Sequence, residues 1–197
     1  YPIPAGYLER ETEVKKSRFI ARVAPVGTRD EVKEWLEQAH QDHPDARHIC
    51  WAYQIGRPGS AAEAAMNDDG EPSGTAGKPI LSVIQHKDMG DVLVMVIRYF
   101  GGIKLGAGGL VRAYAGAAES VLSAVDRVVQ QPVVDTRVIL SFADEQPLRH
   151  WCDVHGASVD SVDYGATVRA RVSVPENLIA DFGAFCDAQK LDYSFER

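Results

Sequence analysis

The feature that most constrains the fold is an uninterrupted apolar stretch at residues 92–97, which has a glycine-rich segment on each side. A strand with an apolar residue at every position is typical of a sheet that is covered on both faces. The stretch is also far shorter than the roughly 20 apolar residues needed to span a bilayer. We therefore expect a globular protein with this strand in its interior, and no membrane partner.

Periodicity in the first part of the chain predicts alternating strands and helices. Thr28 followed by Glu31 forms a capping box, and the apolar residues after it recur at helical spacing. A second apolar helical face runs from Leu110 to Val125. The expected elements are, in order, a strand at residues 12–26, a helix ending at 43–45, a strand at 49–55, a loop at 56–72, a helix at 75–85, the strand at 92–97, a loop at 101–109 and a helix at 110–125.

After about residue 129 the pattern changes to that of a second, smaller domain. Its expected order is strand, helix, strand, strand, helix, strand, and residues 167–174 alternate cleanly between polar and apolar side chains. This order is typical of a ferredoxin-like module. We therefore predict an α+β protein of two domains, residues 1–130 and residues 131–197, the second of them a ferredoxin-like βαββαβ sandwich.

The net charge of −7 argues against a general nucleic-acid binder, because such proteins are normally basic. Residues 1–130 hold 15 Lys and Arg against 17 Asp and Glu, whereas residues 131–197 hold 6 against 11. Any RNA-binding patch is therefore expected to be local and to lie in the first domain. The three cysteines form no CxxC pair, which is typical of reduced core thiols and predicts a cytoplasmic location.

Two glycine-rich segments, at residues 68–79 and 98–110, each lead into an expected helix. Glycines before a helix expose backbone N–H groups, and the helix dipole favours an anion at that end. The opposing positive charge could come from Lys78, Arg98, Lys104 and Arg112, so these segments suit a phosphate group. The alternative is that the glycines only permit tight turns. Five glycines within residues 101–109 are more than one turn requires.

Established phosphate motifs do not fit the two segments. Gly77-Lys78 is followed by Pro79, which breaks the Walker pattern. Val111 stands where the dinucleotide fingerprint needs its third glycine. No side chain in these segments has the sequence signature of an activated nucleophile. We predict no catalytic residue and no cofactor.

Two groups of residues could in principle bind a metal, but neither has the pattern of a metal site. Asp68, Asp69 and Glu71 offer the oxygen ligands that Mg²⁺ prefers, although acidic residues in a Gly/Pro loop are usually solvated. The spacing of the histidines at positions 40, 43 and 48 and the cysteine at 50 matches no structural zinc pattern. We predict no bound metal.

Arginines mark one face of the expected second-domain sheet. Arg137, Arg169 and Arg171 could lie on its open side, where ferredoxin-like proteins bind RNA. Such a platform normally stacks bases on aromatic side chains, but this face offers Thr167 and Ser173 in an acidic domain. A solvated face is the favoured interpretation.

Four segments resemble, in the same order, the signatures of the IMPACT family in its bacterial YigZ-type branch. They are KKSRF at residues 15–19, HPDARH at 43–48, DDGEPSGTAGKP at 68–79, and RYFGG at 98–102 continuing to GAGGLVRAY at 106–114. The resemblance covers residues 15–115. The part after residue 130 resembles the family's bacterial C-terminal domain in pattern and placement.

This resemblance implies an N-terminal βαβ-type fold like that of a small-subunit ribosomal protein domain, elongation factor G domain IV and the GHMP kinases. It implies a second domain similar to elongation factor G domain V. Eukaryotic relatives regulate translation by means of an additional N-terminal domain, so their partner is not expected for this chain. An older label of proline dipeptidase for some members finds no metal-ligand set in this sequence.

Three hypotheses for the function follow. The leading one is a non-catalytic, translation-linked regulatory protein that binds RNA, the ribosome or a protein partner through the glycine-rich surface of the first domain. The alternative is a small-molecule phosphotransferase or nucleotide-binding enzyme of GHMP-kinase-like fold. A third is a protein adaptor with Tyr99, Phe100 and Tyr114 as aromatic anchors, although we expect Tyr114 to face the core. The sequence does not indicate the oligomeric state.

The predicted binding residues come from the segments that carry the resemblance. They are Arg18, His48, Asp68, Asp69, Gly70, Glu71, Thr75, Gly77, Lys78, Arg98, Tyr99, Gly101, Gly102, Lys104, Gly106, Gly108, Gly109, Arg112 and Tyr114.

Overall fold

The computed structural model describes residues 1–196 of the chain. It contains two compact units, Tyr1–Gln130 and a second that begins at Gln131. Both combine strands with helices, so the predicted α+β class is confirmed. Within the described residues, no helix is both long and apolar enough to cross a membrane.

The first unit is built on a five-stranded sheet in the order β2-β3-β6-β4-β5, in which all neighbouring strands are antiparallel. Because β3 and β4 both pair with β6, they run parallel to each other, and the helix between them completes a βαβ unit. The strands are β1 (Pro2–Pro4), β2 (Leu8–Val14), β3 (Ser17–Pro25), β4 (His48–Ile55), β5 (Glu63–Asn67), β6 (Val92–Tyr99) and β7 (Arg127–Val129). The helices are α1 (Arg29–Asp42), α2 (Gly77–His86) and α3 (Gly106–Ala124).

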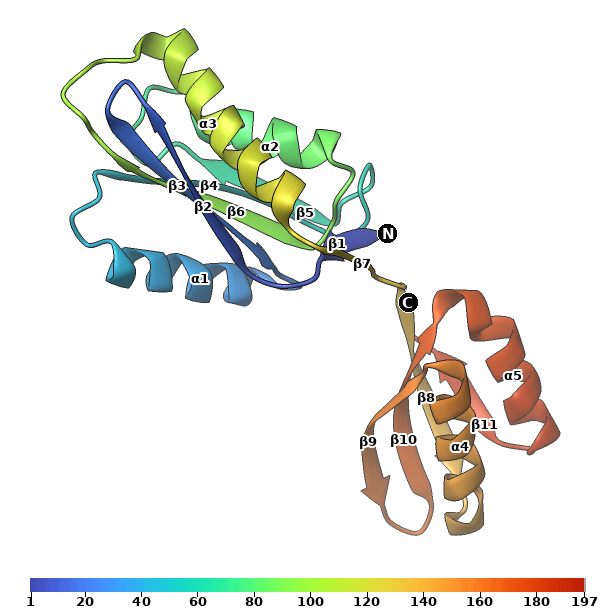
Figure 1. Ribbon diagram of the computed structural model, residues 1–197. Helices are drawn as coiled ribbons and strands as arrows, with labels where there is room; N and C mark the ends of the chain where they lie inside the picture. Colours follow the sequence, from blue (N-terminus) through green and yellow to red (C-terminus); the bar gives the residue numbers. More distant parts are fainter. Residues whose placement is uncertain (197) are drawn as a thin grey trace. The chain divides into compact units, whose positions relative to one another are not determined.

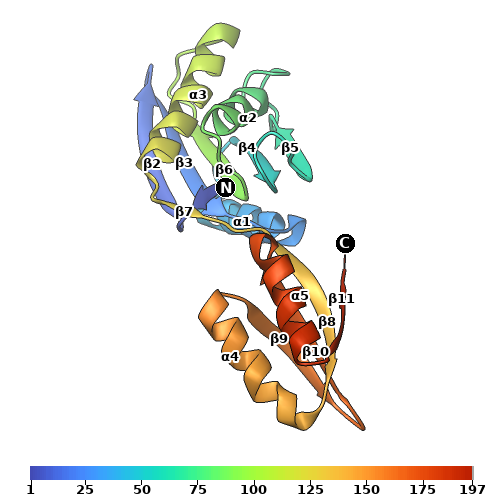
Figure 2. The ribbon, with the colours of Figure 1, turned by 90° about the vertical axis from the view of Figure 1, so that its right-hand side faces the viewer.

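Helices cover both faces of this sheet: α2 and α3 lie on one side and α1 lies on the other (Figures 1 and 2). The central strand β6 serves both layers, because alternate side chains of a strand point to opposite faces. Val92, Val94 and Val96 belong to the core under α2 and α3. Leu93 and Met95 belong to the core under α1. This confirms the prediction of a strand covered on both faces.

Three local predictions for the first unit were wrong. Residues 12–26 are not one strand, because Lys15 and Lys16 adopt positive φ angles of 46° and 64° and turn the chain back as a β2–β3 hairpin. The expected loop at 56–72 contains edge strand β5, which pairs with β4. Helix α3 begins at Gly106, inside the expected loop at 101–109.

The second unit has the predicted ferredoxin-like order and a four-stranded antiparallel sheet arranged β11-β8-β10-β9. Its elements are β8 (Val133–Leu140), α4 (Glu145–His155), β9 (Ser158–Tyr164), β10 (Val168–Pro175), α5 (Ile179–Ala188) and β11 (Asp192–Phe195), with short 3₁₀ turns at Phe142–Asp144 and Glu176–Leu178. One sheet face packs under α4 and α5 through residues such as Val138, Val172 and Phe182. The other face carries the polar half of the alternation.

Candidate functional site

The carboxylate of Asp68 occupies the backbone donors at the start of α2. Its Oδ1 accepts hydrogen bonds from the N–H groups of Gly77 at 2.8 Å and Ala76 at 3.1 Å, and its Oδ2 accepts from Gly74 at 2.9 Å. Burial alone would raise the pKa of Asp68, but the three donors outweigh it and hold the pKa below its usual value. This helix entry is therefore capped by the protein's own anion.

The neighbouring residues fix the same turn to β4 and β5. Asp69 accepts twice: its Oδ2 from the N–H of Ile49 at 2.7 Å, and its carbonyl oxygen from Nδ1 of His48 at 2.7 Å. Thr75 donates its hydroxyl to the carbonyl of Pro72 at 2.5 Å. A side chain at Gly77 would come within 2.8 Å of backbone in β5, so only glycine fits there.

Glu71 follows this turn and is the centre of a buried polar cluster. Its Oε1 accepts from Nη1 of Arg98 at 2.6 Å and from the hydroxyl of Tyr114 at 2.7 Å, and Nε2 of His48 lies 3.8 Å away. The Glu71 side chain is only 3% exposed. Burial raises the pKa of Tyr114, and nearby Cys50 and Glu71 raise it further. Tyr114 is therefore a neutral hydrogen-bond donor that faces the core, as expected.

An open pocket of about 370 Å³ lies directly beside this cluster. Its walls come from the end of β6, the segment before β4, the turn before α2 and the start of α3. The lining residues are Arg47, His48, Glu71, Pro72, Arg98, Phe100, Lys104, Leu105, Gly106, Ala107 and Leu110. Five of these were predicted site residues: His48, Glu71, Arg98, Lys104 and Gly106. We call this cavity the β6–α3 pocket.

Arg98 is the most deeply placed cation of the β6–α3 pocket. The residue is 6% exposed, and its Nη1 is engaged by Glu71. Its Nε is buried and has no hydrogen-bond partner among residues 1–196. A buried unsatisfied donor is costly in a folded protein. An acceptor that reached this N–H group would satisfy it.

The start of α3 differs from the start of α2. Among residues 1–196, no side chain caps it in the way that Asp68 caps α2. Gly106 has a φ of 72°, which favours glycine, and it is exposed together with Ala107 and Gly108. The positive end of the α3 dipole thus borders the β6–α3 pocket without an internal anion.

Other predicted residues lie apart from the pocket. Arg18 and Tyr99 belong to the α1 side of the sheet, where Arg18 pairs with Glu11 at 2.5 Å and the Tyr99 hydroxyl hydrogen-bonds with Nδ1 of His43 at 2.6 Å. Lys78 is exposed on α2, and Arg112 is exposed one turn into α3; neither lines the pocket.

The remaining predicted glycines have different local roles. A side chain at Gly101 would collide with the carbonyl of Lys16 in the β2–β3 turn, at 2.0 Å. Gly70 and Gly102 have φ angles of 84° and 87°. Gly108 and Gly109 lie in the first turn of α3. These positions shape the chain around the pocket.

Two pocket residues, Arg47 and Phe100, were absent from the predicted binding residues, although Phe100 was named as an aromatic anchor of the adaptor hypothesis. Phe100 is 46% exposed, and the guanidinium carbons of Arg98 and Arg47 lie 5.6 Å and 6.0 Å from its ring centre. Both residues stand inside segments quoted for the family resemblance, beside His48 and Tyr99. Their position next to predicted residues in the sequence is the feature that could have identified them as pocket residues.

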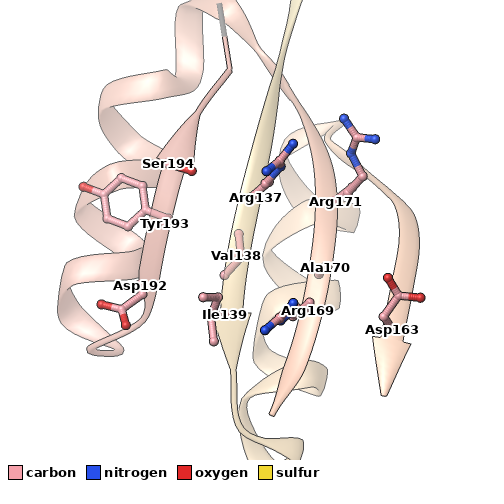
Figure 3. Close-up of a pocket in the computed structure, with 10 residues that line it drawn as sticks. All are labelled: Arg137, Val138, Ile139, Asp163, Arg169, Ala170, Arg171, Asp192, Tyr193 and Ser194. Atoms are coloured by element: carbon pink, nitrogen blue, oxygen red, sulfur yellow. The ribbon is translucent and has the colours of Figure 1, made fainter. Parts of the chain in front are cut away.

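The second unit presents the three arginines on its open sheet face, as predicted (Figure 3). They line a hollow of about 600 Å³. Arg137 and Arg171 both pair with Glu196, the latter at 2.8 Å, and Arg169 stands opposite Asp163 in the strand register. Tyr193, the aromatic residue of this lining, pairs with Val138 and packs against the core on the helix side of the sheet, so it gives the open face no stacking surface. Acidic neighbours thus balance the arginines.

Comparison with known proteins shows which protein family this chain resembles. Residues 15–122 match the model described as the Impact N-terminal domain, and residues 138–185 match a domain of unknown function, DUF1949. The IMPACT family member YigZ of Escherichia coli K12 is 37% identical over 185 residues, which cover 92% of this chain and 89% of that protein. This chain belongs to the IMPACT family.

Further relatives agree with that assignment. An IMPACT family member of Haemophilus influenzae is 32% identical over 93% of this chain and 89% of its own length. A crystal structure described only as that of a hypothetical protein covers 100% of this chain and 97% of its own, with 32% identity and a TM-score of 0.83. The family resemblance carried by the four sequence segments and the two-domain fold are therefore confirmed.

Proposed function

We propose that this IMPACT family member is a non-catalytic, translation-linked regulatory protein that binds RNA, on the ribosome, through the glycine-rich surface of its first domain. The observation that carries the proposal is the β6–α3 pocket. There Arg47, Arg98 and Lys104 meet an uncapped helix N-terminus, and both features favour phosphate.

Local charge supports this choice despite the net charge of −7. Among residues 1–196, Glu71 is the one carboxylate that lines the β6–α3 pocket, and it accepts hydrogen bonds from Arg98 and Tyr114. Exposed Lys78 and Arg112 lie on α2 and α3, the helices that cover the same sheet face. The excess of acidic over basic residues is 2 in the first domain and 5 in the second, so most of the net negative charge belongs to the second domain.

The translational part of the proposal rests on the family and on its fold. The βαβ arrangement of the first domain is the type expected from the resemblance to elongation factor G domain IV. Regulation of translation is the role that the resemblance implies for eukaryotic relatives. The cytoplasmic location proposed from the cysteines fits a ribosomal partner.

Co-sedimentation with ribosomes tests this proposal. We expect the full chain to pellet with ribosomes at low salt and to be released between about 50 and about 200 mM KCl, because phosphate contacts release counterions. Lys104→Glu combined with Arg112→Glu should abolish pelleting. Lys33→Glu with Arg29→Glu, on α1 at the opposite sheet face, is the charge-matched control. No pelleting at low salt, or equal loss in both double variants, would refute the proposal.

One observation favours the alternative of a small-molecule phosphotransferase or nucleotide-binding enzyme. The volume of the β6–α3 pocket, about 370 Å³, lies within the range of small-molecule sites. This alternative predicts that ATP, GTP or a sugar phosphate with Mg²⁺ raises the melting temperature by mass action and that phosphate transfer follows. An unchanged melting temperature across these compounds would exclude it.

A further inference from the structure

We propose that the β6–α3 pocket binds a nucleotide through a terminal phosphate monoester, supplied either by a free nucleotide or by the end of an RNA strand. The RNA source rests on the proposed function, whereas the free nucleotide does not. The inference deepens that function, because it names the chemical group that enters the pocket and the part of an RNA molecule that can present it.

The position of Arg98 is the first reason for a terminal phosphate. Arg98 lines the pocket with a side chain that is 7% exposed, and its buried Nε has no hydrogen-bond partner among residues 1–196. A phosphate diester within a strand is linked on both sides, so the chain would have to enter and leave the cavity to bring it there. A monoester has one link and can approach with three free oxygens.

Charge is the second reason. Arg47, Arg98 and Lys104 supply three positive charges to the lining, and Glu71 supplies one negative charge. Arg47, Arg98, Lys104 and Glu71 together therefore give the lining two net positive charges. A phosphate monoester carries about −1.5 to −2 at neutral pH, whereas a diester carries one charge. The Glu71 oxygen that accepts from Arg98 and Tyr114 is oriented toward these donors.

The start of α3 provides the third reason. Gly106 and Ala107 line the pocket, and the helix they open has 19 residues and no side-chain cap. Backbone N–H groups at such an end bind phosphate oxygens readily. The phosphate would thus lie between the α3 N-terminus, Lys104 and Arg98. The Asp68 carboxylate already fills the equivalent position at α2. Of these two helices, α3 is therefore the one whose N-terminus can bind a phosphate.

Phe100 offers a stacking surface for the base of the nucleotide. Its ring is 46% exposed at the rim and has Arg47 and Arg98 within 6.0 Å of its centre. Exposed aromatic rings with neighbouring arginines stack on nucleobases, and such stacking tolerates different bases. Leu105 and Leu110 give the pocket an apolar wall. These features suit one nucleotide with little base preference.

Calorimetric titration of the full chain with AMP and with adenosine, both without Mg²⁺, tests the free-nucleotide form. AMP should bind at least tenfold more tightly than adenosine. Lys104→Gln should remove most of that difference, and Phe100→Leu should weaken both compounds. Lys33→Gln is the matched control, because it removes a similarly exposed charge from α1. Arg98 is left unchanged, since its loss would strand buried Glu71. Equal affinity for AMP and adenosine, or no effect of Lys104→Gln, would overturn the inference.

Short RNAs of one sequence, ending in a 5′-phosphate, a 3′-phosphate or hydroxyls only, test the strand end. Fluorescence anisotropy should show at least tenfold tighter binding for a phosphate-terminated RNA, and Lys104→Gln should cancel this preference. Equal binding of all three RNAs would overturn the strand-end form and leave the proposed RNA function standing. AMP binding with no RNA binding would support the pocket and contradict the proposed function.

Discussion

The guanidinium of Arg98 and the carboxylate of Glu71 form a buried ion pair, with 2.6 Å between Nη1 and Oε1. The pair joins the end of the central strand β6 to the turn before α2, and Tyr114 attaches α3 to the same carboxylate oxygen. Three separate parts of the first domain therefore meet at one group. This junction holds Arg98, whose buried Nε has no partner among residues 1–196, in the lining of the β6–α3 pocket.

Tyr114→Phe should destabilise the first domain while keeping its packing. The substitution removes a buried hydrogen bond to a carboxylate, which is worth about 2 kcal/mol of unfolding free energy. Tyr7→Phe removes an exposed hydrogen bond to Glu9 in the same domain and should cost less than about 0.5 kcal/mol. Urea denaturation measures both values. Equal losses in the two variants would contradict the role given to Tyr114.

Asp68→Asn should lower stability and reduce its dependence on pH. The folded pKa of Asp68 lies below its unfolded value, so its charge stabilises the fold above the unfolded pKa of about 3.9. This contribution is lost as the pH falls through the folded pKa. The variant should be less stable by about 1 kcal/mol near neutrality, as for a lost helix cap. Urea denaturation from about pH 6 to about pH 3 should show the gap to wild type closing; a constant gap would contradict this role.

Gly101→Ala should be strongly unfavourable. The new Cβ would lie 2.0 Å from the Lys16 carbonyl oxygen, and backbone cannot yield as a flexible side chain can. We expect a loss of about 2 kcal/mol or more. Gly116→Ala is the control, because Gly116 lies in the interior of α3 with open space around it. That change should stabilise the protein by about 0.5–1 kcal/mol. Thermal unfolding of both variants should shift in opposite directions.

The three thiols should be unreactive in the folded protein. Burial is the main cause that raises the pKa of Cys50 and Cys186 to about 12 and that of Cys152 to about 11. Because the thiolate is the reactive form, iodoacetamide at about pH 8, near the free thiol pKa, should label native protein slowly. Labelling should become fast at all three positions in urea. Rapid native labelling of Cys50 would show that the core beneath Tyr114 opens readily.

Much of the fold could be predicted because the spacing of apolar residues within one segment is enough to identify a strand or a helix. The apolar run at residues 92–97 gave the central strand, and the alternation at residues 167–174 gave β10. The β2–β3 turn escaped notice because Lys15 and Lys16 adopt positive φ without any glycine. Edge strand β5 was hidden by small and polar residues, since its stability comes from pairing with β4.

Several residues of the candidate site could be predicted, but not which of them lie together in the folded protein. Sequence alone treated the two glycine-rich helix entries alike, and only the three-dimensional contacts show that Asp68 caps one of them. Strand alternation separates Tyr99 from Arg98 by placing them on opposite sheet faces. Arg47 joins Lys104 in the pocket although 56 positions separate them in the chain, a proximity that no local pattern contains.

The side-chain Nε–H resonance of Arg98 in a ¹⁵N-labelled sample gives the most direct test of the β6–α3 pocket. We predict that AMP shifts this resonance together with the backbone amides of Gly106 and Ala107, and that adenosine leaves all three in place. An unchanged Arg98 signal at AMP concentrations that shift other residues, or an equal response to adenosine, would contradict the account.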